Sequence, residues 1–262
     1  MDLELKNKVV IVTGGASGIG EAIVRTLAIE GAIPVILDKK SPDDCETLLD
    51  ELDIEAVDGA YLRVDLTDAE QVAQAVRTTI LRYETIDGLV NNAGVNDAVG
   101  LDASPTAFRG SLEKNLISAF TITHFATPHL RANAPSAIVN IGSKVAVTGQ
   151  GGTSGYAAAK GGLAALTREW ALDLAASRVR VNAVMPAEVW TPMYDDWLSG
   201  QADPSGRRAE IEGRIPLGQR MTEAQEIADT VLFLLSPRSS HTTGQILHVD
   251  GGYVHFDRAY RP

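Results

Sequence analysis

Two kinds of hydrophobic pattern alternate along the chain. Short apolar runs, rich in β-branched residues and bounded by turn residues, predict strands buried on both faces, as in a parallel sheet. These runs cover residues 8–13, 33–37, 60–64, 87–90, 136–141, 179–184 and 245–249. Longer segments with apolar residues three or four positions apart predict helices. They cover residues 21–30, 41–52, 67–83, 105–130, 156–176 and 222–235, with Thr67 and Thr222 as expected caps.

This alternation predicts the α/β class, with one doubly wound domain over residues 1–262. Residues 187–216 are irregular by comparison and are rich in Trp, Asp, Gly, Arg and Pro, so we interpret them as a substrate lid with short helices. In a doubly wound sheet a ligand lies beyond the carboxyl ends of the strands. The residues at those ends are Gly14, Asp38, Asp65, Asn92, Ser143 and Pro186.

A glycine loop joins the first strand to the first helix. The residues Gly14-Gly15-Ala16-Ser17-Gly18-Ile19-Gly20 stand directly between the two elements. Glycines let the backbone approach a pyrophosphate, and a helix N-terminus offers free N–H groups and the positive end of its dipole. The loop therefore predicts a dinucleotide site, although a plain tight turn is the alternative.

Asp38 closes the second strand, close to where an acid binds the adenosine ribose in dinucleotide-binding folds. Its carboxylate would accept hydrogen bonds from the ribose hydroxyls and repel a 2′-phosphate, which favours NAD. The basic residues Lys39 and Lys40 follow directly and would soften this preference, so NADP stays possible. A simple turn residue at a strand end is the other interpretation of Asp38.

A tyrosine and a lysine stand four residues apart in an Ala-rich run, Tyr156-Ala-Ala-Ala-Lys160. Residues four apart lie on one face of a helix, so we expect the ammonium to stand near the phenol and to lower its pKa. A general base usable near neutral pH would result. Asn115 lies mid-helix among apolar neighbours, which indicates that it is buried and needs hydrogen-bond partners.

The chain is acidic, with a net charge of −11, and this argues against nucleic acid or an anionic membrane as a partner. The one cysteine, Cys45, excludes an internal disulfide and a cysteine-built metal site, so no metal is expected. The first residues are charged and lack an apolar signal region, and no run of about 18 apolar residues occurs. The simplest location is the cytoplasm.

Taken in order, these motifs resemble the short-chain dehydrogenase/reductase family in its NAD-preferring form. The matching residues are Thr13-Gly14-x-x-x-Gly18-Ile19-Gly20, Asn91-Asn92-Ala93-Gly94, Asn115, Ser143, Tyr156-x-x-x-Lys160 and the segment 186–191. The resemblance covers nearly the whole chain. It implies a Rossmann-type domain with a seven-stranded parallel sheet, hydride transfer with a nicotinamide cofactor, and a homotetramer built on long helices.

The resemblance also implies residue roles. Tyr156 would be the general acid/base, Lys160 would lower its pKa and bind the nicotinamide ribose, Ser143 would hold the reacting oxygen, and Asn115 would hold a water in a proton relay. Residues implied to contact the cofactor are Gly14, Ser17, Gly18, Ile19, Gly20, Asp38, Asp65, Leu66, Asn92, Ala93, Gly94, Tyr156, Lys160, Pro186, Val189 and Thr191.

Narrower segments resemble bacterial L-fucose dehydrogenases of this family. They are residues 92–97, 147–150, 186–188 with 191–192, and 250–259. This resemblance implies oxidation of the anomeric hydroxyl of L-fucose, or of a similar aldose, to the lactone. Candidate substrate-binding residues are Ser143, Tyr156, Asn96, Asp97, Lys144, Gln150, Glu188 and Trp190. Glu188 departs from the Pro-Gly that many members carry; it is either a pocket carboxylate or a solvated loop acid.

Two rival hypotheses stay open. The same fold reduces 3-oxoacyl chains on acyl carrier proteins, and Arg207, Arg208 and Arg214 would give an acidic carrier a basic entrance. The net charge and Asp38 argue against that reaction. Other ketones or secondary alcohols, including apolar ones such as steroids, are further substrates to consider. A binding protein that keeps the fold without the chemistry should have lost part of the catalytic set, yet Ser143, Tyr156 and Lys160 are all present.

Overall fold

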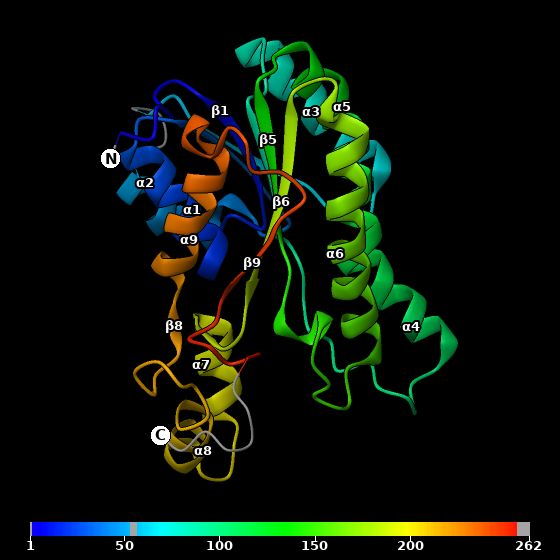
Figure 1. Ribbon diagram of the computed structural model, residues 1–262, viewed down its shortest axis with the longest axis vertical. Helices are drawn as coiled ribbons and strands as arrows, with labels where there is room; N and C mark the ends of the chain where they lie inside the picture. Colours follow the sequence, from blue (N-terminus) through cyan, green and yellow to red (C-terminus); the bar gives the residue numbers. More distant parts are fainter. Residues whose placement is uncertain (1, 53–56, 256–262) are drawn as a thin grey trace.

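The computed structural model describes residues 2–52 and 57–255, and a seven-stranded parallel sheet runs through its middle (Figure 1). The strands are β1 (Val9–Thr13), β2 (Ile33–Asp38), β3 (Ala60–Arg63), β4 (Gly88–Asn91), β5 (Ser136–Ile141), β6 (Val179–Pro186) and β9 (Ile246–Val249). Their spatial order is β3-β2-β1-β4-β5-β6-β9. The order reverses direction between β1 and β4, which is where a doubly wound sheet opens a ligand site. The predicted fold class is confirmed.

Helices cover both faces of this sheet. The helices are α1 (Gly18–Ile29), α2 (Glu46–Leu52), α3 (Ala69–Tyr83), α4 (Pro105–Leu112), α5 (Ser118–Ala132), α6 (Ser154–Ala175), α7 (Pro192–Ser199), α8 (Pro204–Glu212) and α9 (Ala224–Leu235). Figure 1 shows α1 and α9 on one side of the sheet and α3, α5 and α6 on the other. The sheet is therefore a buried middle layer, as the apolar strand runs predict.

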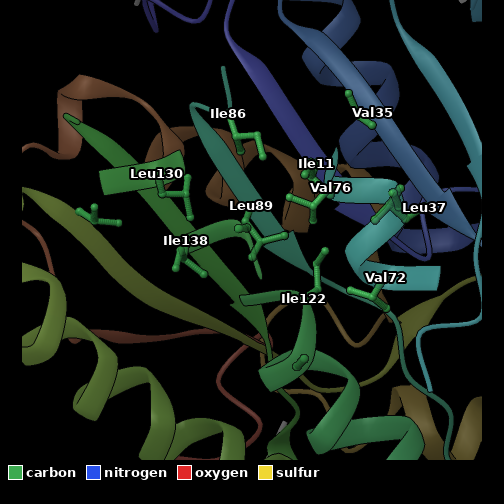
Figure 2. Packing of buried hydrophobic residues seen from close by; sticks show 14 of the residues in the cluster. Ile11, Val35, Leu37, Val72, Val76, Ile86, Leu89, Ile122, Leu130 and Ile138 are labelled. Carbon is green, nitrogen blue, oxygen red and sulfur yellow. The ribbon is translucent and has the colours of Figure 1, made fainter. Parts of the chain in front are cut away.

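Alternate strand residues point into two separate apolar clusters. Ile11, Leu89 and Ile138 pack with Val72 and Leu130 against α3, α5 and α6 (Figure 2). Their neighbours in sequence, such as Val12, Val90 and Val139, pack on the opposite face with α1 and α9. Full burial of such a side chain contributes about 1.5–3 kcal/mol to folding. Because helices cover both faces of the sheet, consecutive strand residues, which point to opposite faces, must both be apolar.

Several helix boundaries differ from the predictions. Asp68, not Thr67, caps α3, because its carboxylate accepts hydrogen bonds from the backbone N–H groups of Glu70 and Gln71. Thr222 does not cap α9; it forms the short strand β8 (Thr222–Glu223) instead. Helix α6 begins at Ser154, ahead of the expected start at Tyr156. Neighbouring hydroxyl and carboxylate side chains can each cap a helix N-terminus, and sequence spacing alone does not predict which of them does so.

The predicted helix over residues 105–130 is interrupted. A π-helical turn, Glu113–Ile117, separates α4 from α5 and contains Asn115. π turns of this kind are rare; most are single turns inside α-helices, and they are frequent at functional sites. Asn115 is 1% exposed, so the prediction that it is buried is confirmed.

Residues 187–216 contain short elements, as expected. Strand β7 (Val189–Trp190) pairs in parallel with β8, and helices α7 and α8 follow β7. In Figure 1 these helices lie beyond the lower end of the sheet. They have an apolar cluster of their own, Leu198, Ile211, Ile215 and Met221, with Tyr253 packed against it. This segment is therefore a small packed unit at the carboxyl ends of the strands.

Candidate active site

The glycine loop packs tightly against the start of α1. A Cβ atom at Gly20 would lie 2.0 Å from the carbonyl oxygen of Gly14, so only glycine fits there. Gly14 and Gly18 have φ angles of 62° and 57°, in the left-handed region. Ser17, the N-cap residue of α1, makes no side-chain capping hydrogen bond. Backbone N–H groups of the first turn are thus left for an anionic ligand such as a pyrophosphate.

Thr13 ties the glycine loop to the end of β4. Its hydroxyl donates to the carbonyl of Val90 (3.2 Å) and accepts from the backbone N–H groups of Asn92 (3.0 Å) and Ala93 (3.1 Å). The side-chain amide of Asn92 donates to the carbonyls of Thr13 and Gly14, both at 3.0 Å. No role was predicted for Thr13 from the sequence. Its hydroxyl at the end of a buried strand is the feature that could have indicated this hydrogen-bonding role.

Asp38 is 8% exposed and lies beside the glycine loop. One carboxylate oxygen accepts from the N–H of Ala16, and the other accepts from the N–H of Lys40, both at 3.1 Å. The carboxylate is therefore fixed at the end of β2 by backbone donors. Asp65 and Leu66 follow β3, the next strand outward. The N–H and hydroxyl of Thr67 donate to Asp65 and lower the pKa of its carboxyl.

Tyr156 lies near the start of α6, and its hydroxyl shares a hydrogen bond with Ser143. Burial raises the pKa of the Tyr156 phenol, and the bond to Ser143 opposes this only in part. The net shift of the phenol's pKa is therefore upward, opposite to the lowering expected from Lys160. The ammonium of Lys160 lies 5.6 Å from the centroid of the Tyr156 ring, over its face, and burial is the largest influence on the pKa of the phenol.

Lys160, Asn115 and Gly94 converge at one point. The ammonium of Lys160 is buried and donates to the carbonyl of Ile141 at 2.8 Å, and desolvation lowers its pKa to about 8. Asn115 accepts from the N–H of Val95 at 2.7 Å. A Cβ atom at Gly94 would lie 2.9 Å from Asn115 Oδ1 and 3.3 Å from Lys160 Nζ. The geometry thus brings three residues from distant parts of the chain to the ends of β4 and β5.

The 187–216 segment reaches the glycine loop through Thr191. A Cβ atom at Gly18 would lie 3.3 Å from the Thr191 methyl group. Thr191 caps α7, with its hydroxyl accepting from the N–H of Tyr194 at 3.3 Å. Pro186 and Val189 are buried just before it, at the end of β6 and in β7. These residues lie between the glycine loop and the sheet ends, where the family resemblance puts the nicotinamide.

The predicted substrate residues fall into two groups. Lys144 and Glu188 form a buried ion pair, and Trp190 lies under the guanidinium of Arg208, 4.1 Å from its ring centroid. Asp97 instead accepts from the hydroxyl of Ser111 at 2.8 Å and pairs with Lys114, which holds its loop to α4. Gln150 and Asn96 are exposed. Among residues 2–52 and 57–255, no hydrogen bond or ion pair joins Asn96, Asp97 or Gln150 to the Lys144–Glu188 pair.

A cavity of about 590 Å³ lies beside the end of β9, lined by residues such as Arg220, Glu226, His248 and Asp250. None of the predicted catalytic residues lines it.

Within residues 2–52 and 57–255 we find no group of three or more His, Cys, Asp or Glu side chains that could hold a metal ion. In the same part of the chain, no helix has the length and apolar character required to cross a membrane.

Known proteins share this architecture over nearly their full length. A short-chain dehydrogenase family model described as "Enoyl-(Acyl carrier protein) reductase" matches residues 14–254. The 3-oxoacyl-[acyl-carrier-protein] reductase of Thermotoga maritima is 36% identical over 96% of this chain and 100% of its own. The L-fucose dehydrogenase of Bos taurus is 37% identical over 96% of this chain and 91% of its own.

Solved structures agree with this. The crystal structure of Cj0485 dehydrogenase matches with a TM-score of 0.94 and 44% identity over 99% of both chains. The aldohexose dehydrogenase of Thermoplasma acidophilum matches with a TM-score of 0.89 and 30% identity over 100% of both. With the glycine loop, Tyr156 and Lys160 placed as described, this chain belongs to the short-chain dehydrogenase/reductase family of oxidoreductases.

Proposed function

We propose that this enzyme oxidises the anomeric hydroxyl of L-fucose, or of an aldose with the same ring configuration, to the lactone with NAD. The sugar assignment rests on the buried Lys144–Glu188 pair. Lys144 directly follows Ser143, the residue expected to hold the reacting oxygen, so the pair offers charged groups to the same substrate. A sugar offers several hydroxyls and requires precisely placed polar partners, whereas an apolar alcohol does not. The names of the bovine enzyme and of the Thermoplasma enzyme point to the same substrate class.

In this proposal the reaction divides between a hydride and a proton. The glycine loop and Asp38 would hold NAD, which would supply the acceptor for the hydride that leaves the anomeric carbon. Tyr156 takes the hydroxyl proton as general base, and Ser143 hydrogen-bonds the reacting oxygen. Lys160 supplies positive charge beside the phenol, and Asn115 orders the backbone of the loop after β4. The 187–216 segment acts as a lid within a single domain of residues 1–262.

The cofactor preference rests on Asp38. Its carboxylate is fixed at the end of β2 by the N–H groups of Ala16 and Lys40. A 2′-phosphate beside this fixed negative charge would be repelled at short range. We therefore propose NAD as the preferred cofactor, with NADP the weaker alternative.

Reduction of 3-oxoacyl carrier proteins is the second candidate, because the Thermotoga relative carries that name. The three arginines expected to form a basic entrance for this reaction are each paired with a nearby carboxylate. Arg207 and Arg214 pair with Glu210, and Arg208 pairs with Glu212 at 2.9 Å. These neighbouring carboxylates offset most of the positive charge that an acidic carrier would need.

Steady-state NADH formation with a panel of aldoses, NAD and NADP compared, tests the proposal. We expect the highest kcat/KM with L-fucose or an aldose of the same ring configuration, and a ratio in favour of NAD. Turnover of a 3-oxoacyl thioester, with none for any aldose by protein that binds NADH, would replace the sugar assignment with the second candidate.

The homotetramer and the cytoplasmic location stay predictions. The exposed apolar side chains Ile117, Phe120 and Leu172 on the long helices support an assembly through this face, since such side chains are commonly covered by a partner. Light scattering coupled to size-exclusion chromatography should give four times the chain mass of 27.9 kDa. A monomer would contradict the assembly.

A further inference from the structure

The Lys144–Glu188 ion pair stands at the carboxyl ends of two neighbouring strands. Lys144 comes immediately after Ser143, beyond β5, and Glu188 comes shortly after Pro186, the last residue of β6. β5 and β6 are hydrogen-bonded to each other along their length. Both charges therefore belong to the sheet edge that carries Ser143, and not to the outer surface of the 187–216 segment.

Two aromatic residues from other segments complete this cluster. The hydroxyl of Tyr194, in α7, donates to the second carboxylate oxygen of Glu188 at 3.0 Å. The ammonium of Lys144 lies 4.3 Å from the centroid of the Tyr253 ring, which follows β9. The side chains of Lys144 and Glu188 are only 8% and 16% exposed. Four separate parts of the chain thus hold one charged pair in a fixed geometry.

Fold stability does not account for this pair. Desolvation of two buried charges commonly outweighs their attraction, and an apolar replacement of similar volume is often neutral or stabilising. Burial, assisted by the charge of Arg214, lowers the pKa of Lys144 to about 8. The adjoining cluster of Leu198, Ile211 and Met221 already packs this region without charges.

The pair also keeps hydrogen-bonding capacity. An ammonium has three donors, and each carboxylate oxygen has two acceptor sites. The contacts described above use one donor of Lys144 and one acceptor site on each oxygen of Glu188. A ring hydroxyl can donate to the carboxylate and accept from the ammonium at once, so adjacent hydroxyls of a sugar match the remaining groups.

We propose that Lys144 and Glu188 together bind the ring hydroxyls nearest the reacting carbon, those at positions 2 and 3, and are the specificity-determining residues for a polyhydroxylated ring. This inference rests on the proposed aldose oxidation and names the residues that enforce it. A site built to hydrogen-bond a substrate hydroxyl discriminates strongly against the analogue without it, because the buried groups are left unpaired. An acyl chain or an apolar alcohol would leave the remaining donors of Lys144 and the remaining acceptor sites of Glu188 without partners.

The test combines enzyme variants with deoxy substrates. The kcat/KM of the best aldose is measured against its 2-deoxy and 3-deoxy analogues. The proteins are the wild type, Glu188→Gln, the double variant Lys144→Met/Glu188→Met, and Glu70→Gln as control. Glu70 is an exposed carboxylate on α3, with a side chain 91% exposed. The double variant removes both charges together, so that no buried charge is left alone. NADH titration confirms that each protein is folded.

We expect the wild type to prefer the parent sugar over at least one deoxy analogue by about 100-fold or more. Glu188→Gln and the double variant should reduce this preference at least about tenfold, chiefly by losing activity on the parent sugar, while Glu70→Gln keeps it. An equal loss of activity on parent and deoxy sugars, or an unchanged preference, would overturn the role of the pair but would leave the proposed function standing. No turnover of any aldose by the wild type would overturn the proposed function as well.

Discussion

The reactivity of Tyr156 depends on how its phenol is buried. Replacing it with phenylalanine removes the proton acceptor and the bond to Ser143 but little volume. We expect Tyr156→Phe to lose about 10²–10⁴-fold in kcat, with NADH affinity close to the wild type. Tyr83→Phe is the matched control, since the Tyr83 hydroxyl donates to an exposed carbonyl, that of Asp58. Near-normal turnover by Tyr156→Phe would remove this residue from the chemistry.

The pH dependence follows from the same burial. The raised pKa keeps the Tyr156 phenol protonated at neutral pH, and oxidation requires the phenolate. We expect log kcat/KM for oxidation to rise with pH above neutrality, with a slope approaching one per pH unit. Measurements from pH 6 to 10, with stability checked at each point, would show it. A flat profile would mean that another group, or the bound cofactor, sets the ionisation.

At the scale of elements, the first turn of α1 has no room for a side chain at Gly20. Gly20→Ala would force a methyl group against the Gly14 carbonyl. We expect a loss of about 1–3 kcal/mol in unfolding free energy and weaker NADH binding, because the loop must move. Gly110→Ala in α4 meets nothing within 4 Å, so it should gain about 0.5–1 kcal/mol. Thermal unfolding and NADH titration compare the two; equal effects would contradict the packing argument.

The strands and the glycine loop were predictable because buried parallel strands and tight turns leave local signatures in sequence. The Asp68 cap and the β8 strand were not, since each depends on competition between neighbouring polar groups. Lys144 follows β5 and Glu188 follows β6, and the pairing of these two strands in the sheet brings the two residues together. Sequence reasoning named both residues but not their contact. It missed Tyr194 and Tyr253, which packing alone places.

For the whole molecule, the sheet couples two apolar clusters into one structure. Ile138 and Val139 are neighbours in β5, both 0% exposed, and point into opposite clusters. We expect Ile138→Ala and Val139→Ala each to cost about 2 kcal/mol or more and to lower one shared unfolding transition. Denaturant unfolding followed by tryptophan fluorescence and by far-UV circular dichroism tests this. Separate transitions for the two variants would mean that the faces unfold independently.

The π turn at Glu113–Ile117 fixes the number of residues that the chain must have between α4 and α5. It holds one residue more than a regular helix needs, so it is equivalent to a single-residue insertion. Each residue of an α-helix advances the side-chain direction by about 100°. A chain one residue shorter here would have to turn either Asn115 away from Val95 and Gly94, or the apolar face of α5, with Ile122 and Leu130, away from the sheet. The exposed Glu113 in this turn should therefore tolerate substitution, whereas a deletion anywhere in the turn should not be tolerated.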